Sequence, residues 1–314
     1  MEEIDDEPSK KAKPDNAATP FQHISSFGDF KPRRILSEDA RTKFMAVEGT
    51  FGTDTAVVVV EKTPFSRENY EVVFTADTKL EETFHNDIYT SYGGKVTAAL
   101  NGLTATIICP ATQKHVDKYL FKPQHMITET PKLYKEVTEP YIASQQLSLQ
   151  WVYNILEHKK ESERILFEDP DPETGFILLP DMKWDTKQLE NLYVLAICHK
   201  HGIRSIRDLT PDHLPLLRNI NEKVSVALAL QFGVPSHRLR GYLHYQPSYY
   251  HLHVHFSVLG FEAPGTQVER AHLLTTVISN LEMCPDYYRQ ATLGFTVKEG
   301  DGLHAKYKEA NYFD

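Results

Sequence analysis

The chain is poor in cysteine and has no long apolar run. It has 314 residues, of which only Cys109, Cys198 and Cys284 are cysteines, and no two of them form a C-x-x-C pair. This spacing excludes a disulfide framework and a zinc knuckle. No stretch approaches the roughly 18 apolar residues that span a bilayer, and no signal-peptide pattern opens the chain. We therefore expect a cytoplasmic and nuclear protein with no membrane partner.

Positive charge is also scarce. The sequence holds 34 lysines and arginines against 43 aspartates and glutamates, which gives a net charge of −9. Proteins that bind long nucleic acid neutralise its phosphates with many basic side chains, so we exclude long nucleic acid as a partner. If the ligand is a polyphosphate, the lysines and arginines that neutralise it must lie close together at the binding site.

What is present indicates a globular α+β protein, because 41% of the residues are hydrophobic and 25% are charged. We predict a disordered acidic tail over 1–22, a β-rich domain over 23–120, a linker over 121–142, and a second domain over 143–314. In the β-rich domain, β-branched runs predict strands at Ala56–Glu61, Tyr70–Thr75 and Thr104–Cys109, and a helix is expected at Ser37–Phe44.

The second domain mixes helical and extended patterns. Apolar spacing and capping residues predict helices at Ser144–Ile165, from Asp185 through Leu189 and Cys198 to Gly202, at Thr210–Gly233 and at Gln267–Glu282. Strands are predicted at Leu239–Tyr245, through the following histidines as the second arm of a hairpin, and at Ala291–Val297, where a strand could close the sheet.

Three histidines stand at alternate positions near the C-terminal end, His251, His253 and His255. Alternate side chains of a strand share one face, so the three imidazoles would line one face while the apolar residues Leu252 and Val254 pack into the core. Neighbouring imidazoles on this face would lie about 7 Å apart and could converge on one small group.

The spacing alone leaves three uses open. The histidines could bind zinc, carry out phosphoryl or nucleotidyl transfer through a neutral imidazole, or form a solvated strand face. A zinc site needs further ligands, and no Asp or Glu lies between Tyr245 and Gly260. The composition of this segment therefore favours phosphate chemistry.

The segment HLHVHFS, from His251 to Ser257, resembles the histidine-triad motif, with a serine at its last position where an apolar residue is usual. The longer run YLHYQPSYYHLHVHFSVLGFEAPG, with LPDMKW at Leu179–Trp184 and SLQWVYNIL at Ser148–Leu156, resembles the scavenger mRNA-decapping enzymes of the histidine-triad superfamily. The likeness is dense from Ser148 to Glu282 and thinner through NDIYTSY and PATQKHVDKYL.

The resemblance implies a homodimer with a histidine-triad domain, built on an antiparallel sheet with flanking helices, and an N-terminal domain that exchanges strands between protomers. Such enzymes cleave the 5′-5′ triphosphate of 7-methylguanosine cap dinucleotides and short capped oligonucleotides left after mRNA decay. The products are 7-methylguanosine monophosphate and a nucleoside diphosphate, and neither a metal nor another cofactor is implied.

The resemblance also assigns catalytic roles. His253 would attack phosphorus and form a phosphohistidine, for which a neutral imidazole near pH 7 is suited. His251 and His255 would orient the phosphate and donate to its oxygens. The other residues expected near the phosphates are His244, Ser248 and Tyr249.

The remaining matched residues would bind the substrate. Trp151 would stack on the cationic methylguanine and Met182 would cover the other face, while Glu161 would accept hydrogen bonds from the guanine edge. The residues expected at the rest of the site are Pro180 and Asp181 beside the base, the cations Lys118, Lys183 and Arg270 near phosphates or ribose, and Asn86 and Tyr89 in a segment that closes over the partner's site.

Three other functions remain alternatives: a general dinucleoside-polyphosphate hydrolase of the same superfamily, a zinc-dependent hydrolase, and a non-catalytic cap-binding module. The pair Trp151 and Glu161 argues against the first, because a stacking residue and a carboxylate together select a methylated guanine. Chelation tests the second, and product formation tests the third.

Overall fold

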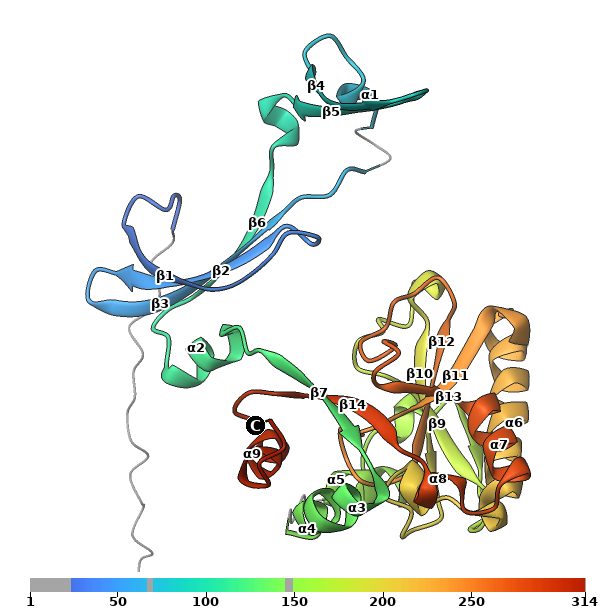
Figure 1. Ribbon diagram of the computed structural model, residues 1–314. Coiled ribbons are helices and arrows are strands. Elements are labelled where there is room, and N and C mark those ends of the chain that lie inside the picture. The colour runs from blue at the N-terminus through green and yellow to red at the C-terminus, as the bar shows by residue number, and fades with distance from the viewer. Residues whose placement is uncertain (1–23, 67–69, 145–148, 314) are drawn as a thin grey trace, which may run out of the picture. The chain divides into compact units, whose positions relative to one another are not determined.

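A computed structural model describes residues 24–66, 70–144 and 149–313 (Figure 1). The chain divides into a unit ending at Phe121 and a unit beginning at Lys122, and each is described by itself. The tail predicted at 1–22 lies outside the described residues. The three cysteines are free thiols. Among the described residues, no helix is both long and apolar enough to cross a membrane.

The N-terminal unit is built on a four-stranded antiparallel sheet in the order β1-β2-β3-β6. Its strands are β1 (Phe30–Asp39), β2 (Phe44–Phe51), β3 (Asp54–Lys62) and β6 (Leu103–Ile108). A separate two-stranded ribbon is formed by β4 (Lys79–Asn86) and β5 (Tyr89–Lys95). The helical pieces are α1 (Tyr70–Val73), η1 (Ala98–Leu100) and α2 (Gln113–Tyr119). A small core of Leu36, Ala46, Val57 and Val116 joins α2 to the sheet.

Two of the predicted strands in this unit are confirmed and two other predictions are wrong. The runs at 56–61 and 104–109 form most of β3 and β6. The helix expected at Ser37–Phe44 is instead the end of β1, a turn and the start of β2, because these strands pair as a hairpin from Phe30 to Phe51. The strand expected at Tyr70–Thr75 is the short helix α1.

The C-terminal unit is built on a six-stranded antiparallel sheet in the order β13-β11-β12-β10-β9-β8. Its strands are β8 (Phe167–Asp169), β9 (Phe176–Pro180), β10 (Tyr193–Cys198), β11 (Leu239–His244), β12 (His253–Val258) and β13 (Ala271–Leu273). A second ribbon pairs β7 (Gln124–Glu129) with β14 (Leu293–Lys298). An α+β fold with an N-terminal β domain and a C-terminal antiparallel sheet flanked by helices is therefore confirmed.

Helices cover the sheet of this unit (Figure 1). The longer ones are α6 (Leu214–Phe232) and α7 (Leu274–Met283), and their apolar sides join the main core together with the apolar residues of β12. On the other face, α5 (Gln150–Leu156) packs Val152 and Ile155 against β9 and β10. The shorter helices are α3 (Pro131–Leu133), η2 (Tyr134–Thr138), α4 (Glu139–Ser144), η3 (Ser162–Arg164), η4 (Leu189–Asn191), η5 (Ile206–Asp208), η6 (Pro211–His213), η7 (Ser236–Arg238), α8 (Tyr287–Gln290) and α9 (Gly302–Glu309).

Several element predictions in this unit need correction. The helix expected from Asp185 to Gly202 is the short η4 followed by β10, which pairs on both sides with β9 and β12. The helix expected at Ser144–Ile165 is shorter, because His158 and Glu161 adopt left-handed backbone conformations after α5 ends. The strand expected at Ala291–Val297 exists as β14 but pairs with β7 rather than with the main sheet.

Other segments lie near their predicted positions. The helix expected at Thr210–Gly233 is η6 followed by α6, with Gly233 in the left-handed conformation that ends it. The hairpin of β11 and β12 is confirmed. In the segment Gln267–Glu282 the helix begins only at Leu274, after β13. Most of 121–142, expected as a linker, forms β7, α3, η2 and the start of α4 within the C-terminal unit.

Candidate active site

The alternation of the histidine segment is present in the structure. β12 begins at His253, and its apolar residues Val254 and Phe256 are buried in the main core. His253 and His255 therefore lie on the opposite face, the one that α5 partly covers. Ser257 follows on that face, fully buried, and it bonds Nε of Arg240 at 3.1 Å. The serine that departs from the motif thus has a polar partner.

His253 is held in one tautomer by the backbone. Its Nδ1 lies 2.8 Å from the carbonyl oxygen of His251, and because a carbonyl only accepts, Nδ1 carries the hydrogen. The lone pair is then on Nε2, which is buried and has no hydrogen-bond partner among the described residues. Burial lowers the pKa of His253 to about 4. The side chain is a neutral imidazole whose free nitrogen can act as a nucleophile.

His255 and His244 complete a cluster of buried imidazoles. The ring of His255 lies 4.0 Å from that of His244 and 4.9 Å from that of His253, between centroids. Burial lowers the pKa of His244 to about 3 and that of His255 well below its ordinary value. Both nitrogens of His244 and Nε2 of His255 lack partners in the described part of the chain. Unpaired buried polar atoms are costly, so the cluster is suited to a polar ligand.

Tyr193 fixes the orientation of His255, and sequence reasoning missed it. Its hydroxyl lies 2.8 Å from Nδ1 of His255. Burial raises the pKa of Tyr193, so the hydroxyl keeps its proton. In the tautomer of His255 in which Nδ1 accepts the hydrogen bond from this hydroxyl, Nε2 carries the hydrogen and is a donor. The apolar run YVLAIC in β10 is the signal that could have found it, since read as a strand it pairs with the histidine strand.

The contacts of His251 lie within the protein. Its ring is buried, and Nε2 lies 2.8 Å from the carbonyl oxygen of Cys198, so the hydrogen on that nitrogen is used within the protein. Its own carbonyl accepts from His253. The structure therefore gives His251 a positioning contact with the nucleophile, rather than a free Nε2–H directed at a phosphate.

Close packing around His244 depends on Gly265. A Cβ on Gly265 would lie 2.3 Å from Nε2 of His244, and its φ of +88° is rarely adopted by other residues. No expectation from sequence pointed to this position. The glycine in the APG turn after the histidine strand was the available signal.

Two cations lie near the imidazoles. Arg270 donates from Nη2 to Oγ of Ser248 at 3.1 Å, and Nζ of Lys183 lies 5.8 Å from the centre of the Tyr193 ring. The charges of Arg270 and Lys183 add to burial in lowering the pKa of His255. The structure thus brings both expected cations, together with Ser248, to the histidine cluster.

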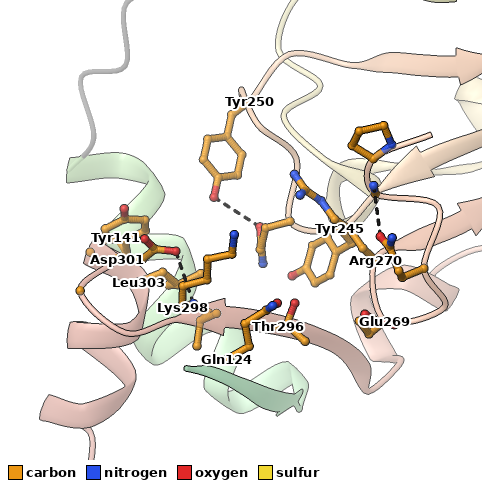
Figure 2. Close-up of a pocket in the computed structure, with 17 residues that line it drawn as sticks. Gln124, Tyr141, Tyr245, Tyr250, Glu269, Arg270, Thr296, Lys298, Asp301 and Leu303 are labelled. Atoms are coloured by element: carbon orange, nitrogen blue, oxygen red, sulfur yellow. Dashed lines mark hydrogen bonds between the residues drawn. The ribbon is translucent and has the colours of Figure 1, made fainter. Parts of the chain in front are cut away.

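A cavity of about 850 Å³ adjoins this cluster (Figure 2). Arg270 and Gly265 line it, and Gly265 is the residue against His244. Figure 2 shows Tyr141 and Lys298 on another side of the same space. Arg270 therefore lines this cavity and also acts electrostatically on His253 and His255.

An aromatic chain links the expected base platform to the nucleophile. The Trp151 ring contacts Tyr249 edge-on at 4.7 Å, and Tyr249 stacks on His253 at 4.0 Å with 14° between the planes. The Trp151 side of this chain is open, since 44% of the residue is exposed. Met182 is 88% exposed in the turn after β9. Two open apolar side chains thus accompany the histidine cluster, as a base-stacking site requires.

Glu161, Arg164 and Pro180 form one hydrogen-bonded group. Arg164 donates from Nη1 to Oε2 of Glu161 at 2.5 Å and from Nη2 to the carbonyl oxygen of Pro180 at 3.0 Å. Asp181, the next residue, accepts from the backbone N–H of Lys183 at 2.9 Å. Arg164 was not among the expected site residues, and no motif in the sequence marks it.

The remaining expected residues belong to the N-terminal unit, which is described separately. Asn86 and Tyr89 face each other at the turn of the β4–β5 ribbon, and Tyr89 is 73% exposed. Lys118 lies on α2 with its Nζ 5.2 Å from the centre of the Tyr119 ring. They stay predictions as site residues.

Side chains spaced closely enough to hold a metal ion occur away from the motif histidines. Within the described ranges, the group whose ligand atoms lie within 4.8 Å of one another is His125, Glu299 and His304, on the β7–β14 side of the unit. The motif histidines are not part of it. Among the motif histidines, His255 lies instead within the electrostatic influence of two cations, Arg270 and Lys183, which suits a phosphate ligand.

Comparison with known proteins agrees with this chemistry. The family profile described as "Scavenger mRNA decapping enzyme (DcpS) N-terminal" matches residues 25–122, and "Scavenger mRNA decapping enzyme C-term binding" matches residues 150–271. A Mus musculus protein named m7GpppX diphosphatase is 49% identical over 88% of this chain and 84% of its own length.

Two further proteins with the same name extend the comparison. The Homo sapiens protein is 48% identical over 90% of this chain and 86% of its own length. The Schizosaccharomyces pombe protein is 40% identical over 88% of this chain and 93% of its own length. Similarity of this extent spans both units. The chain belongs to the scavenger mRNA decapping enzyme family.

Proposed function

We propose that this chain is an m7GpppX diphosphatase, which hydrolyses the 5′-5′ triphosphate of 7-methylguanosine cap dinucleotides and short capped oligonucleotides left after mRNA decay. The observation that carries the proposal is the buried His253, whose Nδ1 is bonded to a carbonyl while Nε2 holds a free lone pair. The relatives named m7GpppX diphosphatase, 40 to 49% identical, supply the substrate class.

The reaction proceeds in two displacements at one phosphorus. Nε2 of His253 attacks the phosphorus next to 7-methylguanosine, an N–P bond forms, and the P–O bond to the remaining diphosphate breaks. The nucleoside diphosphate leaves as a stable anion, so little proton donation is needed. Water then attacks the same phosphorus, the N–P bond breaks, and 7-methylguanosine monophosphate and a proton are released.

The groups around His253 stabilise the phosphate oxygens. Nε2–H of His255 is directed by Tyr193, and His244 lies 4.0 Å from His255 between ring centroids. Arg270, with Ser248, and Lys183 supply the positive charge. In a buried, water-poor site such preorganised donors act strongly on developing charge. His251 acts through its carbonyl, which fixes the tautomer of the nucleophile.

Base recognition is assigned to the segment from Trp151 to Lys183. Trp151 and Met182 are open apolar side chains that would enclose the cationic methylguanine. Glu161 and the carbonyl of Pro180 would accept hydrogen bonds from its edge, and Asp181 would complete the wall beside the base. Tyr249, between Trp151 and His253, sets the spacing from base to reacting phosphorus.

We further propose a homodimer in which the N-terminal units exchange strands, so that Asn86, Tyr89 and Lys118 complete a partner's site. Support comes from the apolar side chains that one chain leaves open on this unit, including Phe74 at 80%, Ile88 at 81% and Phe84 at 60% exposure. Surfaces of this kind mark interaction sites. A cytoplasmic and nuclear location remains our proposal, as the places where capped fragments arise.

The test is product analysis with methylated and unmethylated cap dinucleotides. We expect m7GpppG to yield 7-methylguanosine monophosphate and GDP, with much slower cleavage of GpppG. Equal cleavage of ApppA would favour the general dinucleoside-polyphosphate hydrolase. Tight binding without products would favour the cap-binding module, and activity lost with EDTA and restored by zinc would contradict imidazole attack.

A further inference from the structure

Arg164 joins two hydrogen-bond acceptors that lie in different segments. Its guanidinium donates to Oε2 of Glu161 at 2.5 Å through Nη1 and to the carbonyl oxygen of Pro180 at 3.0 Å through Nη2. Glu161 precedes η3, and Pro180 ends β9. Because the guanidinium is planar and rigid, one side chain fixes both the separation and the relative orientation of the two acceptors.

Glu161 needs such support because its backbone is strained. Its φ of +58° places a non-glycine residue in the left-handed region, which is energetically unfavourable. Such a conformation persists only where surrounding contacts determine it, and it occurs often at ligand sites. The chain holds the carboxylate of Glu161 in a defined place rather than letting it extend into solvent.

The bonded group is accessible to a ligand. The side chains of Arg164 and Glu161 are 32% and 36% exposed, and Nη1 bonds Oε2 of Glu161 rather than Oε1. A carbonyl oxygen has a second lone pair, so Pro180 can also accept another hydrogen bond. Each acceptor that Arg164 holds thus keeps capacity for one more donor.

Guanine carries hydrogen-bond donors that fit these two acceptors. Its Watson–Crick edge presents the N1–H and the exocyclic amine, which are donors, next to each other, whereas adenine presents an acceptor at N1. Two acceptors at fixed separation therefore select guanine. A site built to bond a donor also rejects an analogue that lacks it, because its acceptors are then left unpaired.

We propose that Arg164 is a positioning residue that holds the Glu161 carboxylate and the Pro180 carbonyl as a matched pair of acceptors, and thereby sets the selectivity for guanine. The inference rests on the proposed cap-binding function. Arg164 touches neither the phosphates nor His253 in this arrangement, so its effect falls on binding rather than on the chemical step.

The test compares 7-methylguanosine monophosphate with 7-methylinosine monophosphate, which lacks the exocyclic amine. Binding is followed by fluorescence, since Trp151 is exposed and Trp184 is buried. In Arg164→Ala we expect binding of the guanine ligand to weaken about 10-fold, equivalent to about 1.4 kcal/mol, and that of the inosine ligand less than 3-fold. Arg164→Lys should recover part of the selectivity, because a lysine reaches one acceptor at a time.

Arg218→Ala is the matched control, because Arg218 also donates to a carboxylate at 2.5 Å, that of Glu282, on the outer helices α6 and α7. It should change neither affinity. In turnover of m7GpppG, Arg164→Ala should raise KM and leave kcat within about 2-fold. Thermal unfolding monitors the fold of each variant.

Equal weakening of both ligands in Arg164→Ala and Arg164→Lys, or wild-type binding without preference for guanine, would overturn the role of Arg164. A wild-type protein that prefers the guanine ligand and loses that preference in Arg164→Ala, yet cleaves no cap dinucleotide, would instead refute the hydrolase function and retain the inference. The two failures are therefore distinguishable.

Discussion

The two units of this chain bury apolar side chains to very different extents. In the C-terminal unit, one continuous core encloses large residues such as Phe176, Tyr193 and Phe256 almost completely. In the N-terminal unit the core consists of Leu36, Ala46, Val57 and Val116, while several aromatic residues lie open. Phe74 and Phe65, for example, are 80% and 63% exposed.

This difference in burial suits the C-terminal unit to the chemical step and the N-terminal unit to contacts with another surface. Neutral imidazoles with free nitrogens need exclusion of water, which only the unit with a large core provides. The β4–β5 ribbon, all of whose residues are exposed or half-buried, has little stability of its own, since an isolated two-stranded ribbon is marginal in water. We therefore expect this ribbon to bury its side chains against another surface.

The largest effect should come from the buried site. We expect His253→Asn to reduce hydrolysis of m7GpppG on the order of 10⁴-fold or more, because no other group takes over attack at phosphorus. Cap binding should stay within about 3-fold, since Trp151 and Glu161 are untouched. Single-turnover kinetics and fluorescence titration measure the two quantities. The exposed His237 offers a control as His237→Asn, and residual turnover in His253→Asn close to that of this control would refute the nucleophile.

A smaller effect is expected at the open edge of the same unit. Trp151→Ala should weaken binding of 7-methylguanosine monophosphate by about 10- to 30-fold, or about 1.4 to 2 kcal/mol, through loss of stacking and cation–π attraction. Binding of unmethylated GMP should weaken much less. The control is Trp184→Phe at the buried tryptophan, which should lower the thermal unfolding temperature without changing this ratio. Equal losses for both ligands would argue against cation–π recognition.

The histidine face could be predicted from sequence because it depends on local geometry. Alternation places His253 and His255 opposite Val254 and Phe256 in any strand. The resemblance to a known family added the residues for the base and the phosphates, and the structure brings Trp151, Glu161 and Arg270 to one unit.

Contacts between distant segments could not be predicted. The leucines at 189, 192 and 195 fit helical spacing, yet Leu192 directly precedes β10 and Leu195 belongs to it. The strand character of β10 comes from pairing with β9 and β12. Likewise, Nε2 of His251 lies beside the carbonyl of Cys198, 53 residues away. Neither contact leaves a local pattern in the sequence.

The comparison between the units can be tested with two substitutions of similar local exposure. Ile88 in the N-terminal unit is 81% exposed and Leu230 on α6 is 82% exposed. If the N-terminal unit closes on a second copy, Ile88→Asp buries a charge in that interface and should weaken self-association about 10-fold or more. Leu230→Asp should leave it unchanged. Sedimentation equilibrium gives the dissociation constants, and equal effects of the two variants would contradict the proposed exchange.

The smallest expected effect is on the pH dependence of catalysis. Because burial lowers the pKa of His253 to about 4, the nucleophile stays neutral between about pH 7 and pH 5, where an ordinary histidine would become protonated. We expect kcat/KM for m7GpppG to change less than about 2-fold over this interval. A half-maximal loss near pH 6.5 would show instead that the reacting imidazole is exposed to solvent.

Stability should respond to pH where catalysis does not. His244 and His253 have folded pKa values of about 3 and about 4, below the ordinary value, so as pH falls below about 6.5 the unfolded chain takes up protons that the native state does not. Each such histidine then reduces the free energy of unfolding by up to about 1.4 kcal/mol per pH unit, until pH reaches its folded pKa. His253→Asn removes one of these groups, so its unfolding temperature should fall less steeply between about pH 6.5 and pH 5 than that of the wild type. A slope identical to that of the wild type would mean that His253 is not held neutral by burial.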